Sequence, residues 1–239
     1  MRLVTLPGVF SPISDSRMLA DALREQTLPP HASVLDVCTG SGLLAVSAAL
    51  RGARDVTAVD VSRRAVLTAR LNARLNGVRV RALRGWLFEP VGGRRFDAIV
   101  SNPPYVPADD DELPARGVRR AWDAGRDGRV LLDRLLDEAP AHLRPGGFLL
   151  VVHSSVIGRA ETLRRMAAGG LEPDVVGRRR GPLGPLLTAR AAALEARGLL
   201  APGQRHEDVL VFRARAPWRR GAGAAKRGAE ECGKPHCAR

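Results

Sequence analysis

Apolar residues recur along the chain with two different periods, which predict helices and strands in alternation. Spacings of three and four residues, as among Met18, Leu19, Ala22 and Leu23, are typical of a helix with one buried face. Short runs rich in Val, Leu and Ile are typical of buried strands. Helices are expected at 16–26, 43–51, 62–76, 128–139, 158–168 and 188–197. Strands are expected at 33–37, 55–59, 78–83, 96–101, 148–153, 174–176 and 209–213.

This order of elements predicts an α/β fold of the Rossmann-like kind. Strands that alternate with helices form a mostly parallel sheet, here seven-stranded, with helices on both faces. Ligands bind such sheets at the carboxyl ends of the strands. Unusual residues follow four of the predicted strands at this edge, so we expect a single active site there. They are Asp36 to Gly42, Asp60, Trp86, and Asn102 to Tyr105.

Length and composition favour one globular domain. The chain has 239 residues, 45% of them hydrophobic, which is enough for a stable core. Residues 1–216 are expected to form that domain, and residues 217–239, which lack periodicity, to form a basic, disordered tail. Apolar runs stay well short of the roughly 20 residues of a membrane span, and no signal peptide is recognisable. A cytoplasmic location without a membrane partner is therefore expected.

The formal charge of +13 has two interpretations. One is a nucleic-acid or ribosome-associated partner. The other, which we favour, is a compositional bias toward Arg on a solvated surface, because the charges are dispersed and no basic stripe is interleaved with aromatic residues. The run Arg178-Arg179-Arg180 is open to the same two interpretations, and we expect a solvated loop before Gly181-Pro182.

The first candidate site is the turn after the strand 33–37. Gly40 and Gly42 permit positive φ angles and a close approach of a ligand to the backbone. Asp60, at the end of the next strand, suits a ribose diol, and both features would also fit a dinucleotide. Asp36 separates the two, because a carboxylate repels a pyrophosphate but attracts the ammonium group of S-adenosylmethionine. The structural alternatives are a turn-capping role for Asp36 and a helix-capping role for Asp60.

Cysteine and histidine residues offer weaker candidates. Cys38 is interpreted as a small residue whose backbone lines the methionine part of the cofactor, since no neighbouring base would activate its thiol. His153 ends a strand, and a satisfied, half-buried histidine is favoured over a catalytic base. Cys232, His236 and Cys237 fall short of a four-ligand zinc site, so no metal is expected.

The second candidate site is Asn102-Pro103-Pro104-Tyr105, directly after the strand 96–101. The prolines fix the backbone and remove two N–H donors, but their carbonyl oxygens remain acceptors. Together with the side-chain oxygen of Asn102, they can receive both hydrogens of an NH2 group and orient its nitrogen toward a methyl donor. Tyr105 can stack on a flat substrate group. The segment therefore predicts methylation of a planar nitrogen, with a rigid strand-to-loop turn as the structural alternative.

These motifs together resemble class I methyltransferases, and within them the HemK-like glutamine methyltransferases, over most of residues 5 to 214. Asn102 to Tyr105, followed by Val106, carries the resemblance most specifically. It implies S-adenosylmethionine as cofactor, and as substrate the side-chain amide of a glutamine in a translation termination factor.

Three further segments resemble the short branch of that family, which lacks an extra N-terminal helical domain. They are residues 10–16, 121–129 and 205–211. The resemblance implies that Ser16 touches the cofactor, and it permits a small activator subunit. Trp86 stands where the family has an acidic residue near the adenine, so either its ring stacks on the base or the Leu87 backbone makes the contact.

Three functions follow from these residues. The leading one is a protein-glutamine N5-methyltransferase. The second is an N-methyltransferase for an exocyclic amine of adenine or guanine in RNA or DNA. The net charge favours this function, but the absence of a separate target-recognition domain weighs against DNA. The third is a cofactor-binding protein whose catalysis has lapsed, and Trp86 alone supports it.

Overall fold

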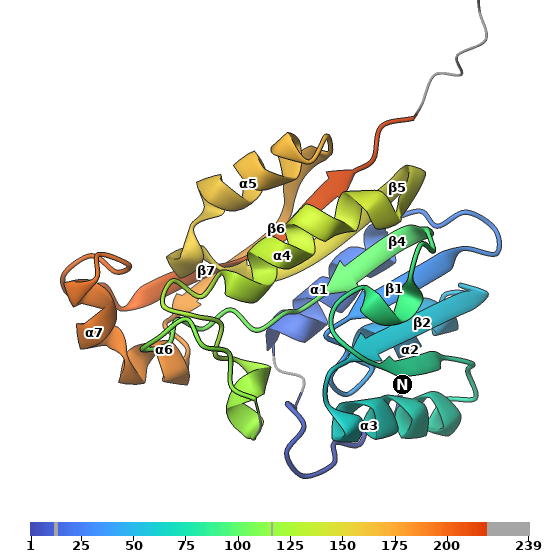
Figure 1. Ribbon diagram of the computed structural model, residues 1–239, viewed down its shortest axis with the longest axis horizontal. Coiled ribbons are helices and arrows are strands. Elements are labelled where there is room, and N and C mark those ends of the chain that lie inside the picture. Colours follow the sequence, from blue (N-terminus) through green and yellow to red (C-terminus); the bar gives the residue numbers. More distant parts are fainter. Residues whose placement is uncertain (12–13, 116, 219–239) are drawn as a thin grey trace, which may run out of the picture.

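Seven strands form one sheet in the computed structural model, which describes residues 1–11, 14–115 and 117–218 (Figure 1). The strand order is β3-β2-β1-β4-β5-β7-β6. Strands β3, β2, β1, β4 and β5 are mutually parallel, whereas β7 runs antiparallel to both β5 and β6. The strands are β1 (Ser33–Val37), β2 (Asp55–Asp60), β3 (Arg81–Arg84), β4 (Phe96–Ser101), β5 (Leu143–Ser154), β6 (Glu172–Pro182) and β7 (His206–Arg215).

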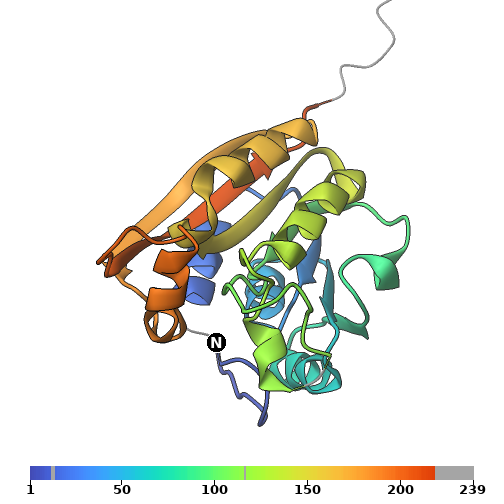
Figure 2. The same ribbon diagram turned by 60° about the vertical axis from the view of Figure 1, so that its left-hand side comes forward.

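Helices cover both faces of this sheet, as predicted. Alternate strand residues point to opposite faces, so Val34 belongs to one apolar cluster and Leu35 to the other. The first cluster includes residues of α1, α2 and α3, and the second includes residues of α4 and α5, which lie together on one side of the sheet in Figure 2. The helices are α1 (Ser14–Glu25), α2 (Leu43–Leu50), α3 (Arg63–Leu75), α4 (Val130–Glu138), α5 (Arg159–Ala168), α6 (Pro185–Ala189) and α7 (Ala191–Ala196).

The carboxyl half of the chain differs from the sequence prediction in several places, since β5 and β7 are longer than the expected 148–153 and 209–213. Strand β6 is much longer than the expected 174–176 and contains Arg178 to Arg180, so the prediction of a loop there was wrong. It pairs with β7 from Glu172 opposite Arg215 to Pro182 opposite His206. The hydrogen bonds of this pairing stabilise the strand, and no local apolar pattern predicts them. The helix expected at 188–197 is two short helices, α6 and α7, which meet at Arg190.

Parts of the predictions lie outside the described residues. The expected disorder of the tail concerns residues that are described only as far as Trp218, and Cys232, His236 and Cys237 all lie beyond it. The domain boundary after residue 216 stays a prediction. No helix in the described part of the chain combines the length and apolar character needed to cross a membrane.

Candidate active site

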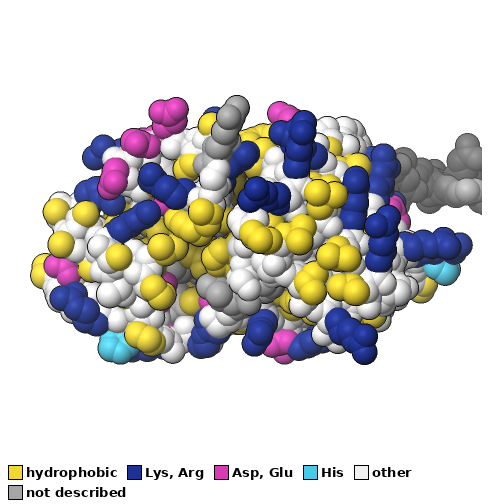
Figure 3. All heavy atoms as spheres, turned by 90° about the horizontal axis from the view of Figure 1, so that it is seen from below, with side chains coloured by type: hydrophobic (Ala, Val, Ile, Leu, Met, Phe, Trp, Pro, Cys, Tyr) yellow, Lys and Arg dark blue, Asp and Glu magenta, His cyan; other side chains and the backbone are white. Residues whose placement is uncertain are grey.

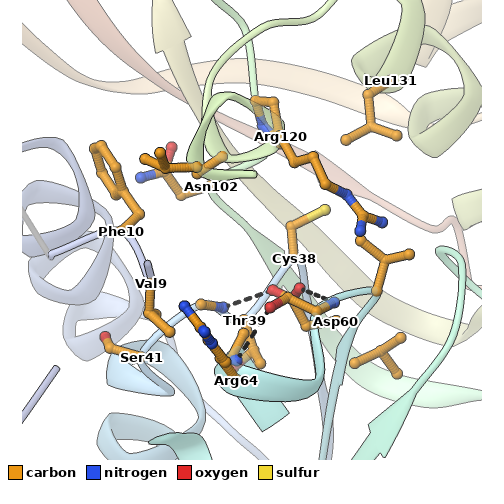
Figure 4. A pocket seen from close by; sticks show the side chains of 18 of the residues that line it. Val9, Phe10, Cys38, Thr39, Ser41, Asp60, Arg64, Asn102, Arg120 and Leu131 are labelled. Atoms are coloured by element: carbon orange, nitrogen blue, oxygen red, sulfur yellow. Dashed lines mark hydrogen bonds between the residues drawn. The ribbon is translucent and has the colours of Figure 1, made fainter. Parts of the chain in front are cut away.

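A cavity of about 780 Å³ opens at the carboxyl ends of the parallel strands (Figure 4). Its walls come from the turn after β1, the end of β2, the residues after β3 and β4, and the segments 113–115 and 117–121. Gly8, Val9 and Phe10 of the amino-terminal segment add a further wall. The volume suits a nucleoside-sized ligand. Of the predicted site residues, the cavity is lined by Ser16, Cys38, Gly40, Asp60, Trp86, Leu87, Asn102 and Pro104.

The two glycines of the turn after β1, Gly40 and Gly42, have different structural roles. Both have positive φ angles, 53° for Gly40 and 82° for Gly42. A Cβ atom on Gly40 would meet nothing within 4 Å, and this residue lines the cavity. A Cβ atom on Gly42 would lie 2.8 Å from the Cα atom of Ala69. Gly42 therefore permits the close approach of α3 to the turn and does not face the cavity.

Asp60 is held at the cavity wall by two backbone N–H groups. Its Oδ2 accepts a hydrogen bond from Gly40 N at 2.9 Å, and its Oδ1 accepts one from Ser62 N at 2.8 Å (Figure 4). Burial raises the pKa of this carboxyl, while these hydrogen bonds and the positive charge of Arg120 oppose the rise. Each oxygen keeps a lone pair, which suits the two hydroxyls of a ribose.

Asp36 is buried beneath the turn and is absent from the cavity wall. Its Oδ2 accepts hydrogen bonds from Thr39 Oγ1 at 2.5 Å and from Ala45 N at 3.0 Å. Its Oδ1 is buried and has no hydrogen-bond partner in the described part of the chain. Burial raises the pKa of the carboxyl to about 7. The capping role considered from sequence is therefore present, and Oδ1 is the atom left for a cationic group.

Cys38 lines the cavity in a left-handed backbone conformation, with φ at 59°. Burial, followed by the negative charges of Asp60 and Asp36, raises the pKa of its thiol. A protonated thiol is a poor nucleophile, so the side chain contributes volume and not reactivity.

Helix α1 holds the Asn-Pro-Pro-Tyr segment from the side. Asn102 Nδ2 donates a hydrogen bond to Ser16 Oγ at 2.8 Å, which leaves the Asn102 Oδ1 acceptor unused by Ser16. The Tyr105 hydroxyl donates to Asp15 Oδ2, and Asp15 Oδ1 accepts from Arg179 Nη2 at 2.8 Å. The segment is thus fixed at both ends by two successive residues of one helix.

Not every residue of that segment reaches the cavity. Asn102 and Pro104 line it, whereas Pro103 is buried and Tyr105 packs against the second apolar cluster. Desolvation and the neighbouring Asp15 carboxylate raise the pKa of the Tyr105 phenol well above its usual value, so it stays protonated.

Sequence reasoning did not single out the Asp15–Arg179 pair. Asp15 belongs to the segment 10–16 that carries the family resemblance, but its partner could not be predicted, because the two residues are 164 positions apart. Glu207 lies in the same surroundings; burial raises the pKa of its carboxyl, which accepts a hydrogen bond from Gly184 N at 2.7 Å. The run of arginines at 178–180 was the one signal in the sequence, and it did not indicate which residues these arginines would contact.

Trp86 and Leu87 form the wall after β3. Trp86 is half-buried, and the Arg134 guanidinium carbon lies 5.9 Å from its ring centre. Leu87 is buried and takes a positive φ of 40°. A half-buried indole at the cavity wall offers a flat apolar surface to a base.

His153 lies apart from this site. It is fully buried, with Nδ1 2.8 Å from Ser154 O and Nε2 2.9 Å from Thr162 Oγ1. Its ring stacks on Phe212, and burial lowers its pKa to about 3. It is the satisfied histidine expected, although more deeply buried than expected. Among the described residues, no group of three or more His, Cys, Asp or Glu side chains is placed to hold a metal ion.

The fold and this cavity define a class I methyltransferase. The chain of the Encephalitozoon cuniculi Mtq2–Trm112 complex, described as methylating the eRF1 termination factor, has a TM-score of 0.57 at 22% identity, covering 87% of this chain and 99% of that one. The Thermus thermophilus 16S rRNA N2 G1207 methyltransferase, solved with AdoMet and guanosine, has a TM-score of 0.57 at 23% identity, covering 89% of this chain and 46% of that one. At these identities the similarity shows the fold alone.

The chain belongs to the methyltransferase small domain family, whose model matches residues 1–121. A relative from Methanocaldococcus jannaschii, provisionally named a protein N5-glutamine methyltransferase, is 34% identical over 80% of this chain and 95% of its own length. A Geobacter sulfurreducens release factor glutamine methyltransferase is 41% identical over 68% of this chain. The chain spans only 58% of that second relative's length.

Proposed function

We propose that this protein transfers a methyl group from S-adenosylmethionine to the side-chain amide of a glutamine in a translation release factor. The observation that carries the proposal is the Asn102 amide at the cavity wall, oriented by Ser16. The names of the relatives from M. jannaschii and G. sulfurreducens support glutamine as the acceptor. Release factors work with ribosomes, which agrees with the expected cytoplasmic location.

The residues of the cavity fit the proposed cofactor. Asp60 would hold the ribose, Gly40 permits close approach of the backbone, and Trp86 with Leu87 would line the adenine. Asp36 lies beneath the turn and outside the cavity wall, and its Oδ1, which has no hydrogen-bond partner among the described residues, suits a cation beside the turn better than a pyrophosphate. The cofactor, when bound, supplies a methyl group on a positively charged sulfur.

The residues of this chain then position the acceptor. Asn102 Oδ1 and a carbonyl oxygen of the proline pair are the acceptors for the two hydrogens of the substrate NH2 group. With both hydrogens held, the nitrogen lone pair turns out of conjugation and toward the methyl donor. No strong base is needed first, because the nitrogen becomes acidic once it carries the methyl group. The rate enhancement is therefore assigned to proximity and alignment.

Methyl transfer from tritiated S-adenosylmethionine to a purified release factor tests the proposal. Asn102→Ala is expected to lower transfer at least about 100-fold, because the NH2 group loses a positioning acceptor. Binding of S-adenosylhomocysteine, measured by calorimetry, should change little. Gln204→Ala, which removes a half-buried amide that is hydrogen-bonded to Ala201 N and His206 O near the start of β7, is the control and should retain transfer.

Two results would replace this proposal. Label found in nucleic acid instead of protein would identify an adenine or guanine amine as the acceptor. Failure of the wild-type chain to bind S-adenosylhomocysteine would favour the lapsed cofactor-binding protein.

A small activator subunit is part of the proposal, because the E. cuniculi neighbour is described as a complex of two proteins. The chain alone and the chain with a small co-purifying protein from the source cell are compared in the same transfer assay. A rate that rises with the added protein supports the activator, and full activity of the chain alone contradicts it.

A further inference from the structure

A second hollow, of about 570 Å³, lies at the amino ends of β2 and β3, away from the active-site edge. Five arginines line it, and all five are exposed: Arg54, Arg70, Arg74, Arg79 and Arg81. We call these five residues and the hollow between them the arginine groove. Figure 3 shows the underside of Figure 1, with a group of dark-blue basic side chains toward its right-hand end, where β2 and β3 begin.

The sequence builds this groove from two adjacent elements. Arg70 and Arg74 are four residues apart on α3 and so share one helix face. Arg81 begins β3, the strand at the edge of the sheet, and Arg54 directly precedes β2. Arg70 Nη2 also donates a hydrogen bond to Ala82 O at 2.7 Å, which ties the helix to the edge strand. The arginines are therefore held on a rigid frame.

The charge of the groove is not neutralised by carboxylates. Throughout residues 1–11, 14–115 and 117–218, none of its five arginines has an Asp or Glu oxygen within 4.0 Å, whereas Arg94 and Arg144 each do. The single acidic residue of the lining is Asp55, whose Oδ2 is already bonded to Arg94 Nη2 at 2.7 Å and to Ser33 Oγ at 2.8 Å. Five exposed arginines without a carboxylate partner in the described part of the chain thus line one hollow, and the Arg70 guanidinium among them is also bonded to Ala82 O.

The lining indicates what kind of anion fits. It holds no aromatic side chain on which a base would stack. Of its apolar residues, Val56, Ala73 and Ala82 are buried, whereas Val78, Val80 and Leu83 are only partly exposed. None of these apolar side chains is fully exposed, unlike the apolar centre of a protein interface. Guanidinium groups bind phosphate oxygens in pairs of hydrogen bonds. We propose that the arginine groove binds the phosphate backbone of RNA, without reading its sequence.

The choice of RNA over DNA rests on the proposed function, since a release factor works beside ribosomal RNA. The groove and the cavity lie at opposite ends of β2, whose six residues span about 20 Å. RNA in the groove would therefore leave the cavity open to a protein substrate. Arg54, Arg74 and their neighbours would anchor the enzyme while Asn102 acts at the other edge.

Binding of a labelled RNA duplex of about 20 base pairs, followed by fluorescence anisotropy over a range of salt concentrations, tests the inference. The variant Arg74→Glu/Arg81→Glu is compared with Arg159→Glu/Arg180→Glu, which makes the same change of net charge at exposed arginines of α5 and β6. Loss of two phosphate contacts is expected to weaken binding about tenfold or more and to lower the salt-dependence slope by about two. The control variant should lose much less.

Three results would overturn the inference. Equal weakening in the two variants would mean that net charge alone drives binding. Tighter binding of a DNA duplex of the same sequence would assign the groove to DNA. Tighter binding of poly-glutamate than of RNA, with the same dependence on Arg74 and Arg81, would assign the groove to an acidic protein. The assay contains neither cofactor nor methyl acceptor, so its outcome is independent of glutamine methylation, and circular dichroism confirms that each variant is folded.

Discussion

Two adjacent residues at the start of α1 determine how the methyl acceptor would be presented. Ser16 orients the Asn102 amide, because Asn102 Nδ2 donates a hydrogen bond to Ser16 Oγ. Asn102 Oδ1 takes no part in this bond and can accept a hydrogen bond from a substrate. Asp15 takes the Tyr105 hydroxyl and is itself held by Arg179. The phenol is therefore a structural group, and the ring of Tyr105 packs against the second apolar cluster beside the cavity.

This division of roles predicts different outcomes for two changes at Tyr105. Tyr105→Phe removes one hydrogen bond, and Asp15 keeps its ion pair with Arg179. The variant is expected to lose about 1 kcal/mol of stability and to keep methyl transfer within a few fold of wild type. Tyr105→Ala also removes the ring and should lower transfer by about tenfold or more. A large loss of transfer in Tyr105→Phe, measured as kcat, would show that the phenol itself serves the reaction.

Asp36 gives the stability of the cofactor-free protein a pH dependence. Burial raises the pKa of its carboxyl from 3.8 to about 7, so between these values the folded state keeps a proton that the unfolded state releases. The contribution of Asp36 to stability is therefore complete below pH 3.8 and is lost as the pH rises toward 7. The loss is at most about 1.4 kcal/mol per pH unit.

Denaturant unfolding of the wild type and of Asp36→Asn from pH 4 to 8 measures this contribution. The uncharged amide keeps an acceptor for Thr39 and Ala45 and does not titrate. Wild type should lose stability relative to Asp36→Asn across this range. Asp174→Asn, at a side chain that is 62% exposed, serves as the control. A difference for Asp36→Asn that is constant with pH would mean that Asp36 is ionised throughout.

At the scale of elements, the sequence predicted best the strands that are buried on both faces. The bounds of β1 and β4 agree with the expected 33–37 and 96–101, because continuous apolar runs between turn residues leave few alternatives. Strand β6 was underestimated, since its exposed arginines show no alternation and only pairing with β7 makes it a strand. Long-range pairing of this kind has no local signal.

The same distinction holds for the site. The turn at Gly40 and the acceptors at Asn102 were predictable, because backbone freedom and side-chain chemistry are properties of single residues. The burial of Asp36 and the approach of Ala69 to Gly42 were not, since both depend on where α2 and α3 pack.

The start of α4 depends on a glycine that supports the Asn-Pro-Pro-Tyr segment. Gly128 has a φ of 75°, and a Cβ atom there would lie 2.5 Å from Tyr105 O and 2.8 Å from Ile157 Cγ2. Gly170 has nearly the same φ, 76°, but a Cβ atom there would meet nothing within 4 Å. Comparing alanine substitutions at Gly128 and Gly170 therefore separates the cost of backbone strain, which both share, from the cost of a steric clash, which only Gly128 has.

Alanine at Gly170 is expected to cost about 1 kcal/mol, the usual cost of this backbone conformation. Alanine at Gly128 should cost at least about 1 kcal/mol more and should also lower methyl transfer, because Tyr105 must move. Thermal unfolding and kcat of both variants provide the measurement. Equal losses of stability, with transfer intact in Gly128→Ala, would mean that the loop relaxes without disturbing the segment.

At the scale of the whole molecule, the beginning of the chain is attached to the cofactor side of the sheet. Asn72, fully buried on α3, accepts from Val4 N and donates to Val4 O and Ser41 O, each at 2.8 Å. Asn76, one helical turn later, accepts from Arg2 N at 2.8 Å and donates to Arg2 O at 2.6 Å. Both amides hold the segment that places Gly8 to Phe10 at the cavity, but only Asn72 also reaches the turn after β1.

Asn72→Ala is therefore expected to weaken the binding of S-adenosylhomocysteine by about tenfold, which corresponds to roughly one lost buried hydrogen bond. Asn76→Ala removes similar bonds from a more exposed position and should change the affinity by no more than about twofold. Calorimetric titration at a temperature where circular dichroism shows both variants folded separates binding from unfolding. Equal weakening would assign the effect to the amino-terminal segment alone. An unchanged affinity in Asn72→Ala would show that the cavity forms without this connection. A loss of affinity confined to Asn72→Ala would mean that the bonds of Asn72 to Val4 and Ser41 hold the amino-terminal wall and the glycine turn together for cofactor binding.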